Sequence, residues 1–126
     1  MDKKILIVED ERDMREAMSD ALKKEGYEVF EAENGRDGLQ LAIKHEPDLI
    51  LLDLLMPVMG GQEMLKQLRL YAWGRQAKVI ILSAMDDVEN IGHGFEKGIV
   101  DYIIKSNISL SELSLKVKKG IFGVDK

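Results

Sequence analysis

Leu49-Ile50-Leu51-Leu52-Asp53-Leu54-Leu55-Met56-Pro57 is an apolar stretch that contains a single charge, at Asp53. A carboxylate that is buried without a partner costs several kcal/mol. We therefore expect Asp53 at the end of a buried strand, beside a cation or hydrogen-bond donors. A charge kept in such a place indicates that the protein uses its negative oxygen atoms.

Short apolar runs recur on both sides of this stretch. Continuous runs at 5–8 and 79–82 predict buried strands like the one at 49–52. The alternating segment 27–32 predicts a strand nearer a sheet edge, and 102–104 predicts a last strand. Five strands are therefore expected.

Segments with helical spacing of apolar residues separate these strands. The predicted helices are one over 14–22 ending at Gly26, one capped by Asn34 and stopped before Pro47, one from about Gly61 to Tyr71, one opened by Asp86 and Glu89 over 88–95, and one opened by the capping box Ser109-Leu110-Ser111-Glu112. Strict alternation of strands and helices predicts an α/β fold, a doubly wound parallel sheet with right-handed crossovers and helices on both faces.

Composition narrows the possible functions. A chain of 126 residues with 45% hydrophobic and 33% charged residues suits one globular domain. The absence of cysteine excludes disulfides and thiolate metal sites, and it fits a reducing compartment. No run approaches the ~20 apolar residues of a membrane span, and the start is not a signal peptide. A net charge of −5 argues against direct nucleic-acid binding.

Charged and polar side chains follow four of the five predicted strands. They are Glu9 and Asp10, Asp53, Ser83, and Lys105. Alone, each has an ordinary interpretation as a helix cap, an ion-pair partner, a turn residue or a surface lysine. In a parallel sheet, however, the carboxyl ends of the strands meet at one edge, where ligands bind. The whole set together predicts a functional site there.

The charges of this set indicate its chemistry. Two carboxylates ~4 Å apart repel by about 4 kcal/mol at an effective dielectric constant near 20. Three carboxylates and one lysine leave a charge of about −2, which a hard divalent cation such as Mg²⁺ would offset. A metal-bound carboxylate beside a hydroxyl and an ammonium group suits phosphoryl transfer.

Four motifs carry a resemblance to a known family. They are Ile5-Leu6-Ile7-Val8-Glu9-Asp10-Glu11, residues 48–61 around Asp53, Ile80-Ile81-Leu82-Ser83-Ala84, and Gly98-Ile99-Val100-Asp101-Tyr102-Ile103-Ile104-Lys105. In order and spacing they resemble the receiver domains of two-component response regulators, over about residues 3–120. The resemblance implies a flavodoxin-like fold with strand order 2-1-3-4-5, and a single receiver domain over 1–126.

The resemblance also implies a role for each site residue. Asp53 would be the phosphoacceptor, with Ser83 and Lys105 binding phosphoryl oxygens. Glu9, Asp10, Asp53 and the backbone carbonyl of Leu55 would hold Mg²⁺. Ser83 and Tyr102 would form the switch that alters the surface of the last two helices and the fifth strand.

The implied partners are a sensor histidine kinase or phosphotransfer protein, and a downstream target protein or tethered output domain. A homodimer through the face of helix 4, strand 5 and helix 5 is possible on family grounds, with no direct nucleic-acid or membrane contact. We expect a cytoplasmic signalling domain and not an enzyme, because it would catalyse only its own phosphorylation and dephosphorylation.

Three alternatives compete with this interpretation. A nucleotide or flavin module is disfavoured, because the turn Glu9-Asp10-Glu11 after the first predicted strand is not glycine-rich. A Mg²⁺-dependent phosphohydrolase typically carries an acid two residues after its nucleophile, where this chain has Leu55. A receiver-like interaction module that is never phosphorylated ranks second to the phosphoacceptor function, because all the side chains that phosphorylation requires are present. The chain departs from the family at Glu9, where Asp is more common, and at Ser106, which replaces a proline. Gly92, Gly94 and Gly98 suggest a marginally stable fourth helix.

Overall fold

A computed structural model describes residues 2–54, 56, 58–83, 98–106 and 108–123. Its centre is a sheet of five parallel strands in the order β2-β1-β3-β4-β5, as predicted. The strands are β1 (Lys4–Val8), β2 (Glu28–Ala32), β3 (Leu49–Asp53), β4 (Val79–Ser83) and β5 (Ile99–Ile104). The described helices are α1 (Arg12–Lys24), α2 (Gly35–His45), α3 (Gly61–Leu68), the 3₁₀ helix η1 (Trp73–Gln76) and α5 (Leu110–Phe122).

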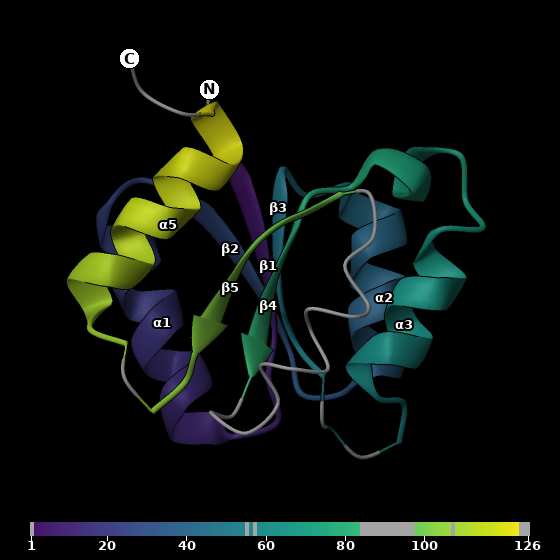
Figure 1. The fold of residues 1–126 in the computed structure, drawn as a ribbon, viewed down its shortest axis with the longest axis horizontal. Coiled ribbons are helices and arrows are strands. Elements are labelled where there is room, and N and C mark those ends of the chain that lie inside the picture. Colours follow the sequence, from purple (N-terminus) through teal and green to yellow (C-terminus); the bar gives the residue numbers. More distant parts are fainter. Residues whose placement is uncertain (1, 55, 57, 84–97, 107, 124–126) are drawn as a thin grey trace.

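The helices cover both faces of the sheet. Figure 1 shows α1 and α5 on one side of the strands and α2 and α3 on the other. This arrangement confirms the doubly wound fold. Five helices were predicted, and the described residues form four α-helices. The predicted helix over 88–95, with its expected marginal stability, lies outside the described residues.

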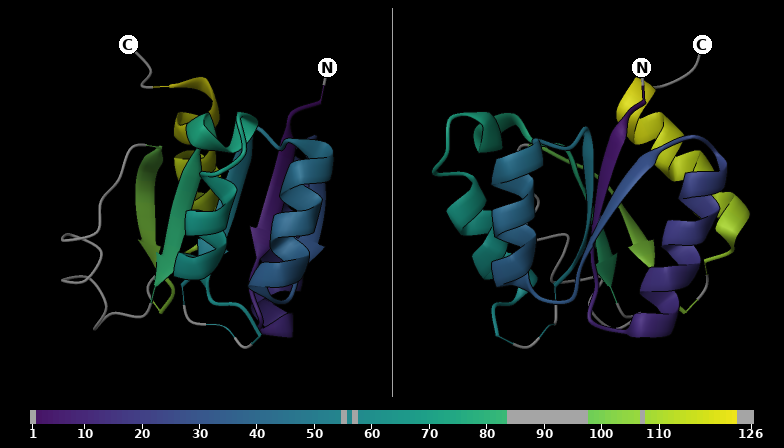
Figure 2. Two further views of the ribbon diagram at one scale, coloured as in Figure 1. Left: turned by 90° about the vertical axis from the view of Figure 1, so that its right-hand side faces the viewer. Right: turned by 180° about the vertical axis from the view of Figure 1, so that it is seen from behind.

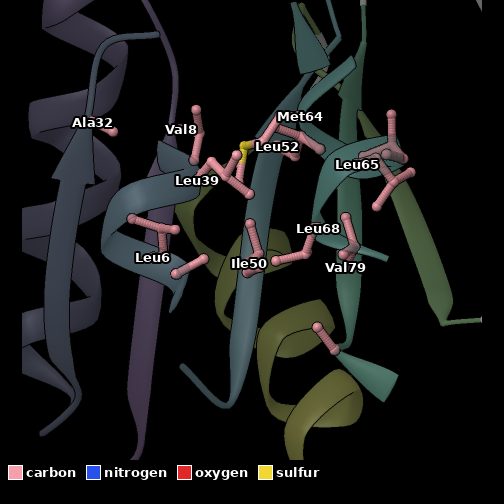
Figure 3. Packing of buried hydrophobic residues seen from close by; sticks show 13 residues of the cluster. Leu6, Val8, Ala32, Leu39, Ile50, Leu52, Met64, Leu65, Leu68 and Val79 are labelled. Atoms are coloured by element: carbon pink, nitrogen blue, oxygen red, sulfur yellow. The ribbon is translucent and has the colours of Figure 1, made fainter. Parts of the chain in front are cut away.

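Alternation along the strands divides the core into two layers. One layer, drawn in Figure 3, joins the sheet to α2 and α3; its buried residues include Leu6, Val8, Leu39, Ile50, Leu52, Met64, Leu68 and Val79. The other layer joins the sheet to α1 and α5; it includes Ile5, Ile7, Leu22, Leu49, Leu51, Ile80, Leu82, Ile103 and Val117. Every residue of β3 and β4 is buried, because helices cover both faces of these central strands.

Side-chain caps explain where α2 and α5 begin. The Asn34 side chain accepts a 2.8 Å hydrogen bond from the Asp37 N–H and opens α2. The Ser109 hydroxyl accepts one of 3.1 Å from the Glu112 N–H and opens α5. Both caps confirm the predicted starts. At the other end, α2 stops with Glu46 in a left-handed conformation (φ 48°), directly before Pro47.

Two predicted boundaries were wrong. The third helix ends at Leu68 and not near Tyr71, because the N–H groups of Leu70 and Tyr71 bond three residues back and tighten the chain. The Arg69 guanidinium then binds the carbonyls of Gly74 and Ala77 and holds the η1 turn. The last strand starts at Ile99 and not Tyr102. Asp101 interrupts its apolar run, but that carboxylate pairs with Lys116 of α5 at 3.1 Å.

The parallel direction of the strands places their carboxyl ends together. Both views in Figure 2 show the arrowheads at the end of the molecule opposite to the start of β1 and the end of α5. The segments that leave β1, β3 and β5 therefore start from one edge of the sheet. Among the residues that the structure describes, none of the helices is both long enough and apolar enough to cross a membrane.

Candidate functional site

Four of the predicted site residues come from the carboxyl ends of four strands. Glu9 directly follows β1, Asp53 ends β3, Ser83 ends β4 and Lys105 directly follows β5. Glu9, Asp53 and Ser83 are buried, with exposed fractions of 0%, 4% and 2%. Burial of two carboxylates and a hydroxyl at one sheet edge is costly unless they find partners.

Lys105 is the cation that joins the two buried carboxylates. Its Nζ lies 3.0 Å from Glu9 Oε1 and 3.1 Å from Asp53 Oδ2. Strand alternation explains the meeting, since Glu9, Asp53 and Lys105 continue the parity of the residues that face α1 and α5. The main-chain N–H of Lys105 also donates to the main-chain carbonyl of Ser83 at 2.8 Å, and this bond holds the end of β5 beside β4.

Glu9 is held by a main-chain donor as well. Its Oε2 accepts a 2.9 Å hydrogen bond from the N–H of Glu11, at the start of α1. Burial, together with the charge of Asp53, raises the pKa of Glu9 to about 7, although the bonds from Glu11 and Lys105 work in the opposite direction. Near neutral pH, the protonated and ionised forms of Glu9 therefore differ little in free energy when no metal ion is bound.

Lys105 shows the reverse balance. Burial alone would lower the pKa of its ammonium group, but the hydrogen bonds and charges of Glu9 and Asp53 outweigh burial and raise it. Lys105 is therefore positively charged throughout the physiological range. A permanent cation beside Asp53 suits the stabilisation of charge on a transferring phosphoryl group.

Three carboxylates lie close enough to share one metal ion. Glu9, Asp10 and Asp53 each offer an oxygen atom, and these atoms lie within 4.8 Å of one another. An all-oxygen donor set suits a hard cation such as Mg²⁺, and Asp10 is the exposed member of the three. The donor set fits Mg²⁺. The Leu55 carbonyl, which the resemblance adds to this set, lies outside the described residues.

Ser83 brings an unused donor to the same edge. It is next to Leu82, whose Cα pairs with that of Asp53 in the sheet. Among the described residues its buried Oγ has no hydrogen-bond partner. A buried hydroxyl without a described partner is uncommon, and its place beside the end of β3 makes Ser83 a candidate donor to a group at the site.

Tyr102 lies on the side of the sheet where the switch residue is expected. It pairs with Ile81 in the register of β4 and β5, and it packs, partly buried, against the core layer under α2 and α3. By strand parity this is also the side of Ser83. The Lys105–Ser106 peptide bond is trans, so the serine that replaces the family's proline has no cis bond before it.

Two further residues support the site, and the sequence analysis did not single them out. A Cβ atom on Gly61 would overlap the carbonyl oxygen of Asp53, so only glycine fits at the start of α3. Arg15 on α1 donates from Nη1 to the Glu9 carbonyl at 2.9 Å. The sequence does contain a signal for Arg15, since it lies one turn into the helix that follows the acidic residues Glu9 and Asp10.

A strand order of 2-1-3-4-5 with acidic, hydroxyl and lysine side chains at the carboxyl edge defines a receiver-type α/β domain. The family model of the response regulator receiver domain matches residues 5–118. The chain belongs to this family, and the expected resemblance is confirmed.

Curated relatives include two regulators. The chain is 38% identical over 115 residues to the transcriptional regulatory protein HprR of Escherichia coli (strain K12), covering 91% of this chain and 50% of that protein. It is 38% identical over 118 residues to the transcriptional regulatory protein SrrA of Staphylococcus aureus (strain NCTC 8325 / PS 47), covering 94% and 47%. The chain thus spans about half the length of these relatives.

Solved structures share the fold. A crystal structure from Chloroflexus aurantiacus J-10-fl superposes with a TM-score of 0.87 at 30% identity, covering 97% of this chain and 99% of that one. The receiver domain of sensor histidine kinase PA1611 from Pseudomonas aeruginosa PAO1 gives a TM-score of 0.84 at 27% identity, with coverage of 97% and 99%. That structure has a magnesium ion coordinated in its active-site cleft.

Proposed function

We propose that this chain accepts a phosphoryl group from the phosphohistidine of a sensor histidine kinase or phosphotransfer protein, and that Asp53 is the acceptor. One observation carries the proposal. A buried carboxylate, Asp53, is held by Lys105 at a sheet edge where the buried hydroxyl of Ser83 has no partner among the described residues. Membership of the receiver family supports it.

The chemistry is a displacement at phosphorus. A carboxylate oxygen of Asp53 attacks the phosphorus atom, the phosphorus–nitrogen bond breaks, and its electron pair stays on the departing imidazole. Lys105, already 3.1 Å from Asp53 Oδ2, stabilises the negative charge on one phosphoryl oxygen, and the Ser83 hydroxyl donates to another.

Glu9, Asp10, Asp53 and the main-chain carbonyl of Leu55 are the groups that would hold Mg²⁺. When bound, Mg²⁺ supplies positive charge that offsets the carboxylates and the incoming phosphoryl oxygens. Without it, the clustered carboxylates would repel the anionic donor.

The output of the reaction is a change of surface. Ser83 at the end of β4 and Tyr102 on β5 share one side of the sheet, so movement of Ser83 toward a phosphoryl group on Asp53 frees space for the Tyr102 ring. This switch alters β5 and the last two helices, which act on a downstream target or tethered output domain. HprR and SrrA are transcriptional regulatory proteins, and we infer a regulatory role of that kind for this chain.

We further propose that residues 1–126 form one receiver domain with a core over about 3–120. The domain acts in the cytoplasm as a signalling module whose only catalysis is its own phosphorylation and dephosphorylation. A homodimer through the face of helix 4, strand 5 and helix 5 stays a prediction.

Intact-mass measurement after incubation with Mg²⁺ and a small phosphodonor such as acetyl phosphate tests the acceptor role. We expect the wild type to gain one phosphoryl group, Asp53→Asn to gain none, and Asp20→Asn, at an exposed position of α1, to match the wild type. No gain on the wild type, or an equal gain on Asp53→Asn, would contradict the proposal and favour a receiver-like module that is not phosphorylated.

A further inference from the structure

Arg15 reaches from α1 back to the residues that carry the metal-binding carboxylates. Its Nη1 donates to the Glu9 carbonyl at 2.9 Å, and its Nε lies 3.3 Å from Oε1 of Glu31 on β2. Only 13% of the Arg15 side chain is exposed. Arg12, three residues earlier on the same helix, is 78% exposed and pairs with Glu16 at the surface.

The main chain of Glu9 is thereby held on both sides. Its N–H donates to the Ala32 carbonyl at the end of β2 at 3.0 Å, and its carbonyl accepts from Arg15. The Arg15 N–H donates in turn to the Glu11 carbonyl at 3.0 Å. The connection between β1 and α1, residues 9–11, is therefore attached to the edge strand and to the first turn of the helix.

Main-chain attachment matters most for Asp10. Its side chain is exposed, and no hydrogen bond is described for it, so its direction depends on the backbone on either side. Mg²⁺ requires near-ideal octahedral geometry from its ligands. A connection that is free to rotate would present Asp10 and Glu9 in many directions and would lose metal affinity through ordering entropy.

We propose that Arg15 is a positioning residue for the metal site, and that its ion pair with Glu31 keeps the guanidinium aimed at the Glu9 carbonyl. This inference deepens the proposed function and depends on it for the identity of the metal. The described contacts of Arg15 are with the carbonyls of Glu9 and Glu11 and with the Glu31 carboxylate. Arg15 acts through the main chain, as supporting residues behind metal ligands commonly do.

A purely structural ion pair between α1 and β2 would behave differently. Ion pairs near the surface contribute little to stability, and the loss of one would leave metal binding unchanged. A positioning role instead predicts weaker Mg²⁺ binding and faster amide exchange confined to residues 9–11. The two interpretations therefore separate when metal affinity is measured together with unfolding.

The experiment compares Arg15→Gln with Arg12→Gln, which removes the same charge from the same helix at an exposed position. Mg²⁺ affinity is measured by isothermal titration calorimetry, and stability by urea unfolding in chelator. Amide exchange at Glu9 and Glu11 is measured by NMR on the metal-free protein. Glu31→Gln and Arg15→Lys complete the set, and Glu31→Gln carries the same test if Arg15→Gln does not fold.

We expect Arg15→Gln to bind Mg²⁺ about 10-fold to 100-fold more weakly and to exchange faster at Glu9 and Glu11. Arg12→Gln should match the wild type in Mg²⁺ affinity and in amide exchange. Glu31→Gln should weaken Mg²⁺ binding and speed exchange, as Arg15→Gln does. Arg15→Lys should bind Mg²⁺ more tightly than Arg15→Gln but more weakly than the wild type. At saturating Mg²⁺, the phosphorylation rate of Arg15→Gln should return toward that of the wild type.

Equal Mg²⁺ affinity and equal exchange in Arg15→Gln and Arg12→Gln would overturn the positioning role, whatever the phosphorylation result. Failure of the proposed function has a separate signature: the wild type gains no phosphoryl group. If the wild type bound no Mg²⁺, amide exchange at Glu9 and Glu11 would decide alone, and unchanged exchange in Arg15→Gln would reject the role.

Discussion

At the scale of single residues, one ammonium group serves two buried carboxylates. Lys105 Nζ contacts both Glu9 and Asp53, yet the pKa of Glu9 still rises to about 7 because burial outweighs the compensation. The single charge of Lys105 therefore leaves the negative charge of the carboxylates only partly neutralised when no metal ion is bound. This deficit costs folding stability and favours the binding of metal.

The raised pKa of Glu9 predicts how stability depends on pH. The metal-free folded protein binds more protons than the unfolded chain between the unfolded pKa of 4.5 and the folded pKa of about 7. The free energy of unfolding therefore falls as pH rises through that range, by up to about 3 kcal/mol at ~1.4 kcal/mol per pKa unit. Below pH 4.5 this contribution does not change.

Glu9→Gln should remove most of that dependence. In chelator we expect the variant to be more stable than the wild type at pH 8 and similar to it at pH 4.5, by urea unfolding at both values. Glu11→Gln, at an exposed neighbouring position, is the control, and its free energy of unfolding should depend on pH as that of the wild type does. A wild type equally stable at both pH values would contradict the prediction.

At the scale of elements, two local features affect the connections at the ends of the sheet: the side-chain cap of α5 and the positive φ of Val58 before α3. Ser109 caps α5, the helix that packs against β5, with a 3.1 Å bond to the Glu112 N–H. Val58, in the connection between β3 and α3, has a φ of 69° and is exposed. A β-branched residue rarely adopts this conformation.

Ser109→Ala should destabilise the protein by about 1 kcal/mol, because the first turn of α5 loses its side-chain acceptor. Urea unfolding measures the change. Ser111→Ala removes a hydroxyl from the same turn without removing this bond, and it should stay within about 0.5 kcal/mol of the wild type. Equal losses in the two variants would show that the bond to Glu112 contributes nothing.

Val58→Asn should stabilise the protein by about 1 kcal/mol, because asparagine accepts the left-handed conformation more readily than valine does. Val58→Thr is the matched control, since threonine keeps the branch at Cβ and with it the strain. Stability is measured by thermal or urea unfolding. If Val58→Asn were no more stable than Val58→Thr, the positive φ of Val58 would not be a source of strain.

At the scale of the whole molecule, the parallel sheet gathers groups from distant parts of the sequence. Lys105 is 96 residues from Glu9 and 52 from Asp53, yet it contacts both. Two core layers on opposite faces hold the strand ends in register. Folding of the entire sheet is thus a condition for the proposed metal site.

Mg²⁺ should therefore stabilise the folded domain as a whole. At 100 times its dissociation constant, a ligand that binds only the folded state adds about 2.7 kcal/mol, or roughly 10 °C in Tm for a domain of this size. The shift should be larger at pH 8 than at pH 5, because a proton on Glu9 competes with the metal.

Differential scanning calorimetry with and without MgCl₂ checks this expectation. Asp10→Asn should lose most of the Mg²⁺-dependent shift, whereas Asp13→Asn, an exposed change in the first turn of α1, should keep it. A shift of the same size in Asp10→Asn would exclude Asp10 as a metal ligand.

Sequence reasoning located the strands and the residues at the carboxyl edge, because both depend on patterns within a few residues. The strand order was expected from the resemblance to receiver domains and not from such patterns. Sequence reasoning placed the end of α3 and the start of β5 wrongly, where Arg69 and Lys116 offer partners that local patterns do not reveal. It passed over Arg15, whose role depends on Glu31 across a helix–strand contact.

By itself, the sequence determined the kind of site: apolar periodicity specified a doubly wound sheet, and that topology brings Glu9, Asp10, Asp53, Ser83 and Lys105 to one edge. Only the tertiary structure decided how these groups share their charges. The ammonium group of Lys105 pairs with both Glu9 and Asp53, and the pKa of Glu9 is raised. The Arg15 guanidinium donates a hydrogen bond to the main-chain carbonyl of Glu9. The reason is that burial and contact distance arise from packing between elements, which no local pattern of residues encodes.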